Sequence, residues 1–150
     1  MSVHALPEDA DQPIHLRMDN AEGVMTGQTV LTGAVRMDQG TLRVEAERMI
    51  IDREEDQVFR VTAEGTEVNR AYYHQQLKPG AELVKAKALR IIYHIADERI
   101  ELIGKAYLMQ EKNEFRGEKI NYDIRQGMVV ATSHEKRRVE MILYPEKKDQ

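Results

Sequence analysis

The chain contains no cysteine, and this absence limits its chemistry at once. Disulfide bonds, thiolate metal sites and cysteine nucleophiles are excluded, whereas the cytosol and the periplasm are both compatible compartments. Long apolar runs are also missing, since no stretch approaches the roughly 20 residues that a membrane-spanning helix needs. The first ten residues have neither the basic start nor the apolar stretch of a signal peptide. We therefore expect either a cytosolic protein or a mature chain from which a signal peptide has been removed.

Residues that carry catalysis are few and scattered. The five histidines have no second ligand at helix or strand spacing, and the carboxylates form no recognisable acid–base pair. No glycine-rich phosphate loop precedes a helical segment. We therefore expect no enzymatic activity, no metal and no cofactor. The net charge of -4 also argues against a nucleic-acid partner, which requires a concentrated basic surface.

Alternating apolar and polar residues are the main pattern that the sequence does contain. Near the start, Ile14, Leu16 and Met18 share one face, and similar alternation recurs along the chain between glycine, proline, asparagine and aspartate residues. This period of two is typical of β-strands. Residues 82–103 are rich in helix-favouring alanine, leucine, lysine and glutamate. The apolar alternation over residues 89–95 nevertheless predicts a strand there.

The stretch over residues 31–52 recurs 71 residues later, over residues 102–123, without a gap. Gly33 and Gly104 mark equivalent corners of the two copies. Looser similarities, 31 to 40 residues apart, suggest about four copies of a unit with two or three strands. Such units cannot bury an apolar face alone, so the repetition predicts an all-β roll, barrel or solenoid with a shared interior.

Leucine, isoleucine, valine and methionine dominate the expected interior, and tryptophan is absent. Because methionine adapts to irregular apolar shapes, this interior is either a self-packed core or a surface for apolar ligands. The basic cluster Lys136–Arg138 is either a solvated strand end or a contact for anionic lipid phosphates. The predicted organisation is a polar lead-in over residues 1–11, one β-domain over residues 12–145 and a polar tail over residues 146–150.

Short motifs follow one another in a single register from about residue 11 to residue 145. They are Asp11-Gln12-Pro13-Ile14-His15, Thr32-Gly33-Ala34-Val35, Gln39-Gly40-Thr41, Gly104-Lys105-Ala106-Tyr107-Leu108, Gly117-Glu118-Lys119-Ile120 and Arg138-Val139 with Leu143-Tyr144-Pro145. Their order and spacing resemble the OstA-like family of periplasmic lipopolysaccharide-transport proteins. The resemblance implies an open, twisted, antiparallel β-jellyroll with a hydrophobic groove. It also implies a periplasmic role in carrying lipopolysaccharide from the inner to the outer membrane.

The resemblance further implies where the acyl chains of lipid A would lie. The lining positions of the family correspond here to Ile14, Leu16, Tyr72, Tyr93 and Ile95. Residues that share strand faces with these positions extend the expected groove by Val35, Met37, Val44, Leu108 and Phe115.

The implied partners are lipopolysaccharide, further copies of this chain, an inner-membrane bitopic transport component and an outer-membrane translocon of the same pathway. The first and last strands would be free edges that join head to tail by strand addition. The apolar residues of these edges are Ile14, Leu16 and Met18, and Val139, Met141 and Leu143. Two alternatives remain. One is a polymerising β-solenoid scaffold that binds no lipid; the other is a sugar-binding or sugar-modifying jelly-roll enzyme with interior histidines from among His15, His74 and His94.

Overall fold

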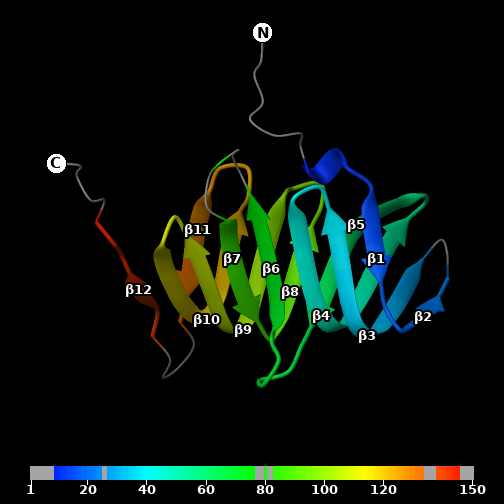
Figure 1. Ribbon diagram of the computed structural model, residues 1–150, viewed down its shortest axis with the longest axis horizontal. Coiled ribbons are helices and arrows are strands. Elements are labelled where there is room, and N and C mark those ends of the chain that lie inside the picture. The colour runs from blue at the N-terminus through cyan, green and yellow to red at the C-terminus, as the bar shows by residue number, and fades with distance from the viewer. Residues whose placement is uncertain (1–8, 25–26, 77–79, 81–82, 134–137, 146–150) are drawn as a thin grey trace, which may run out of the picture.

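The computed structural model describes residues 9–24, 27–76, 80, 83–133 and 138–145, most of which lie in antiparallel strands (Figure 1). Within these ranges there is no α-helix, and a single 3-10 turn, η1 (Asp9–Asp11), precedes the first strand. The strands are β1 (Ile14–Arg17), β2 (Asn20–Gly23), β3 (Gln28–Gln39), β4 (Leu42–Glu54), β5 (Gln57–Glu64), β6 (Ala71–Gln76), β7 (Leu83–Ala88), β8 (Arg90–His94), β9 (Arg99–Gln110), β10 (Asn113–Asp123), β11 (Met128–Thr132) and β12 (Glu140–Ile142). The predicted all-β class is confirmed, and the region expected to be strand and not helix contains β7, β8 and the start of β9 within its described residues.

The strands form two walls that face each other. Each of the long strands β3, β4, β9 and β10 belongs to both walls, because one half of the strand pairs in one wall and the other half pairs in the second wall. The C-terminal half of β3 pairs with β1, whereas its N-terminal half pairs with β2. The same division holds for β4, β9 and β10. Wall A therefore has the order β1-β3-β4-β6-β7-β9-β10-β12, and wall B has the order β2-β3-β4-β5-β8-β9-β10-β11. β1 and β2 lie at one end of the long axis and β11 and β12 at the other (Figure 1).

A bulge marks the place where β3 passes from wall B into wall A. The regular pairing with β4 is interrupted between Thr32 and Val35. Gly33 has a φ of 89°, a conformation that glycine adopts without steric cost. A Cβ atom at this position would lie 2.4 Å from a carboxylate oxygen of Asp19. The glycine corner expected from the sequence is thus the bend that joins the two walls.

The 71-residue repeat is present in the strand registers themselves. Thr32 lies opposite Arg48 in the first copy, and Ile103 lies opposite Lys119 in the second. The bulge also recurs, with a φ of 84° at Gly104. Two modules account for the described strands: β1 to β6 form the first module, and β7 to β12 form the second. The 71-residue repeat thus divides the described strands into two equivalent sets, and the finer subdivision into about four units stays a prediction.

Candidate functional site

The apolar faces of walls A and B point toward each other and form one continuous interior. Its buried members are almost wholly removed from solvent, because alternate residues of the long strands β3, β4, β9 and β10 and of the strands between them face the opposite wall. Of the residues expected to line the groove, five are buried in this interior: Val35, Met37, Val44, Tyr93 and Leu108. Four more are partly buried and pack against it: Ile14, Leu16, Ile95 and Phe115. The structure thus brings nine of the ten expected residues to the interior.

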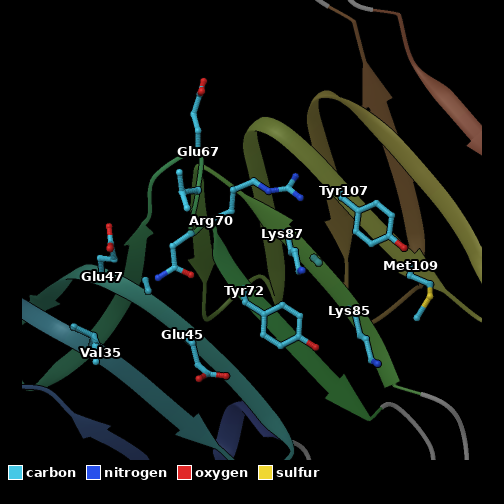
Figure 2. Close-up of a pocket in the computed structure, with 15 residues that line it drawn as sticks. Val35, Glu45, Glu47, Glu67, Arg70, Tyr72, Lys85, Lys87, Tyr107 and Met109 are labelled. Atoms are coloured by element: carbon cyan, nitrogen blue, oxygen red, sulfur yellow. The ribbon is translucent and has the colours of Figure 1, made fainter.

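Tyr72, the tenth residue, lies on the other face of its strand. Its side chain lines a hollow of about 900 Å³ on the outer side of wall A, together with Glu45, Lys85 and Lys87 (Figure 2). Tyr73 occupies the interior position and is fully buried. Two consecutive tyrosines follow Ala71 at the start of β6, so an uncertainty of one residue in the alignment moved the expected aromatic group to the other face of the strand. The hollow itself carries charges of both signs and is unsuited to acyl chains.

Polar bonds join the two walls along one edge of the interior, opposite the glycine bends. We call this edge the mouth. The Tyr93 hydroxyl of wall B donates to Gln39 Oε1 of wall A over 2.9 Å. In the second module, Gln110 Nε2 of wall A donates over 3.2 Å to the carbonyl oxygen of Gly127, in the turn that leads from β10 to β11. Gln39 and Gln110 occupy equivalent positions of the repeat. The repeat therefore places one glutamine across the mouth in each module.

The 3-10 turn η1 covers the mouth of the first module. The carboxylate of Asp9 accepts hydrogen bonds from the Thr41 amide at 3.0 Å, the Thr41 hydroxyl at 2.6 Å and Gln75 Nε2 at 2.6 Å. Gln39 Nε2 donates to two carbonyl oxygens of the same segment, those of Ala10 and Gln12. Gln39 and Gln75 are buried, and their amides are satisfied mainly through these contacts. Residues 9–12 thus act as a polar strap over one half of the mouth.

Burial keeps the interior tyrosines in their neutral form. Desolvation raises the pKa of Tyr73 and of Tyr93 well above that of a free tyrosine, and it raises the pKa of Tyr122 to about 12. Their hydroxyl groups therefore remain hydrogen-bond donors throughout the physiological range. Tyr73 donates to Gln75 Oε1 within its own strand, whereas Tyr93 donates across the mouth. Only the second of these two bonds connects the walls.

The three histidines that the jelly-roll enzyme alternative requires, His15, His74 and His94, do not face the interior. His94 lies 2.6 Å from Glu101 on the outer side of wall B, and His15 and His74 lie on the outer side of wall A. Among the described residues there is no cluster of three or more histidine, aspartate or glutamate residues that could hold a metal ion. No helix in the same part of the chain is long and apolar enough to cross a membrane.

The two ends of the walls are free edges within the described residues. β1 and β2 pair only with β3, and β11 and β12 pair only with β10. Large apolar side chains are exposed at the C-terminal end: Val139, Met141, Leu143 and Tyr144. The apolar residues of β1 are only partly covered. In the basic cluster, Arg138 is exposed, while Lys136 and Arg137 lie outside the described residues.

Comparisons with known proteins agree with this geometry. Residues 15–128 match the family described as LptA/(LptD N-terminal domain) LPS transport protein. The lipopolysaccharide export system protein LptH of Pseudomonas aeruginosa is 33% identical over 155 residues, which cover 97% of this chain and 87% of that protein. LptA of Escherichia coli K12 is 30% identical over 142 residues, which cover 94% and 76% of the two chains. A crystal structure of LptH, described as a periplasmic component of the lipopolysaccharide transport device of P. aeruginosa, has a TM-score of 0.84 and 31% identity, and covers 93% of this chain and 100% of that one.

Proposed function

Because the chain belongs to the LptA/LptD N-terminal domain family of lipopolysaccharide-transport proteins, we propose that it carries lipopolysaccharide across the periplasm. In this proposal the acyl chains of lipid A lie between walls A and B, and the polar head group projects through the mouth. The observation that supports this arrangement most is the continuous apolar interior, which is bordered at the mouth by the polar contacts of Asp9, Gln39 and Gln110. Acyl chains and head group would meet their apolar and polar surroundings at this edge.

Burial of the acyl chains supplies the binding free energy without any chemical step. Each methylene that leaves water contributes roughly 0.8 kcal/mol, so ten methylenes of one chain contribute roughly 8 kcal/mol before any cost is subtracted. The interior side chains already bury one another, however, with Met37, Tyr73 and Leu108 fully covered. The walls must therefore separate before acyl chains enter. The bonds that oppose separation at the mouth are the few polar contacts of Gln39, Gln110 and the strap.

Transport over a distance larger than one subunit requires continuity of the interior between molecules. We propose that copies join head to tail, with the edge at β1 and β2 meeting the edge at β11 and β12. Such a contact does not close on itself, so it extends into a chain of subunits. An inner-membrane bitopic component and an outer-membrane translocon of the same pathway would meet its two ends. Directional movement would then be driven by these partners.

A photo-crosslinking amino acid tests the carrier function. Placed singly at Ile14 or Leu16 of β1, or at Tyr93 of β8, it faces the interior, whereas at His15 of β1 it faces outward. With added lipopolysaccharide, we expect adducts from the three interior positions and none from the outward control. The alternative, a scaffold with a permanently self-packed interior, predicts no adduct at any position. Absence of adducts from all three interior positions would therefore overturn the carrier function.

A further inference from the structure

The groups that hold the Asp9 carboxylate form a small cradle at the mouth. The amide and the hydroxyl of Thr41 reach it from the turn between β3 and β4, and Gln75 Nε2 reaches it from β6. All three groups are hydrogen-bond donors, and together they use both carboxylate oxygens. Donors that converge on one pair of oxygens, a backbone amide among them, are the arrangement by which proteins hold oxyanions.

Gly40 leaves the space that the carboxylate fills. A Cβ atom at this position would lie 2.2 Å from Oδ1 of Asp9. Gly40 also has a φ of 61°, a left-handed conformation that glycine adopts without steric cost. The amide of the next residue, Thr41, donates to the same oxygen over 3.0 Å. The turn between β3 and β4 is thus shaped for an oxyanion, whichever molecule supplies it.

Gln75 is held in its donating orientation from the side of the interior. Its Oε1 accepts the hydroxyl of Tyr73, so its Nε2 is directed at the carboxylate of Asp9. Both Gln75 and Tyr73 are buried. Desolvation is the main cause that raises the pKa of Tyr73, and the nearby charge of Asp9 adds to the rise. The cradle therefore lies at the border between the apolar interior and the mouth.

All donors of the cradle belong to wall A. Thr41 lies in the turn between two strands of this wall, and Gln75 lies in β6. Separation of the two walls therefore removes no donor from the cradle. The Thr41 hydroxyl also lies 3.0 Å from the carbonyl oxygen of Gln76, so it keeps an acceptor when Asp9 leaves. The cradle thus stays intact when the walls open and when its occupant changes.

We propose that this cradle is a binding site for an oxyanion of the lipid head group, a phosphate or a carboxylate, and that Asp9 occupies it while the interior holds no lipid. The inference rests on the proposed carrier function and names a contact that the head group makes at the mouth. Acyl chains between the walls bring the head group to this edge. There its oxyanion replaces Asp9 on the same three donors and displaces the strap.

The charge of the incoming group decides whether this exchange is favourable. Replacement of one oxyanion by another leaves the number of charge-assisted hydrogen bonds unchanged. Replacement by an uncharged group exchanges them for neutral bonds, which are about half as strong. Displacement of the strap should therefore depend on the phosphate groups of the lipid and not on its acyl chains alone.

Asp9→Ala empties the cradle, and Asp11→Ala is its matched control. Asp11 belongs to the same 3-10 turn, but its side chain is exposed and forms no hydrogen bond within the described residues. Inorganic phosphate is titrated into each protein, and the chemical shift of the Thr41 amide is followed by NMR. Because Asp9 competes for the site from within the chain, phosphate should bind Asp9→Ala at least about tenfold more tightly than the unmodified protein or Asp11→Ala.

Two further variants support this titration. Thr41→Val, added to Asp9→Ala, removes the hydroxyl of the cradle and should reduce the gain in phosphate affinity. Asp9→Asn keeps the size of the side chain and removes its charge, so it should shift the affinity in the same direction as Asp9→Ala. An unshifted Thr41 amide in folded Asp9→Ala and Asp9→Asn proteins would overturn the oxyanion site.

Lipid A with its phosphates, and lipid A from which they have been removed, distinguish the lipid from free phosphate as the source of the oxyanion. Asp9→Ala should bind the phosphorylated lipid about tenfold more tightly than the unmodified protein does, and the dephosphorylated lipid with unchanged affinity. An equal gain for both lipids would overturn the oxyanion site and leave a strap that only blocks entry. Failure of the unmodified protein to bind either lipid, with a Thr41 amide that still responds to phosphate in Asp9→Ala, would instead overturn the carrier function.

Discussion

Replacing Tyr93 by phenylalanine removes a tyrosine hydroxyl that donates across the mouth from wall B to wall A. The ring stays, so interior packing is retained. In the closed state the change removes a buried hydrogen bond and leaves Gln39 Oε1 without this donor, a loss of roughly 1–2 kcal/mol. In the open state water replaces the hydroxyl, so the loss disappears. Separation of the walls should therefore become about 5- to 30-fold more favourable.

Tyr73→Phe is the matched control for this change. Tyr73 is also buried, but its hydroxyl donates to Gln75 Oε1 within the same strand and does not connect the walls. Both variants should lower the free energy of unfolding by a similar amount. Only Tyr93→Phe should speed the uptake of a fluorescent lipopolysaccharide, by about 5- to 30-fold, and only this variant should increase the hydrogen exchange of amides at the mouth. Equal uptake rates for the two variants would refute the assignment of the Tyr93–Gln39 bond as a barrier to opening.

Three further changes test other parts of the structure. Gly33→Ala places a Cβ atom against Asp19 on a backbone with positive φ, so the free energy of unfolding should fall by at least about 1 kcal/mol in thermal unfolding. An unchanged melting temperature would contradict the bend geometry. Met141→Asp places a charge on the interior row of the free edge and should yield monomers in analytical ultracentrifugation, and persistent long oligomers would contradict the edge contact. Burial alone would raise the pKa of Asp38, but the hydrogen bonds and positive charges of Arg43 and Arg36 together outweigh it, so the pKa lies below its usual value. The stability that this interaction contributes is therefore present above the unfolded pKa, near pH 3.8, and is lost as the pH falls through the folded pKa. Asp38→Asn should make the melting temperature depend less on pH over that acidic range. An unaltered dependence of the melting temperature on pH would contradict the interaction.

The strands and the repeat were predictable because both depend on local order in the sequence. Alternation assigned Val35, Met37 and Val44 to one face, and that face proved to be the interior. The glycine corners were predictable for the same reason, since Gly33 and Gly104 recur at equivalent points and both adopt positive φ values.

The contacts between the walls were not predictable, because they join residues whose strands are unrelated by local pattern. Gln39 and Gln75 alternate with polar residues on the outer face, and polarity alone does not distinguish a buried glutamine from an exposed one. The burial of these two glutamines depends on Tyr93 and on the strap at residues 9–12, most of which was expected to be a polar lead-in. The assignment of Tyr72 failed for a related reason: a one-residue ambiguity is enough to exchange the two faces of a strand.

The most direct test of the carrier function uses the two consecutive tyrosines of β6. A photo-crosslinking analogue of phenylalanine at Tyr73 faces the interior, and the same group at Tyr72 faces the outer hollow, one residue away in the same strand. Both proteins are irradiated with lipopolysaccharide under identical conditions, and adducts are detected by a shift in gel mobility. Transport of acyl chains between the walls predicts an adduct at position 73 and none at position 72. An adduct at position 72 alone, or at neither position, would contradict it.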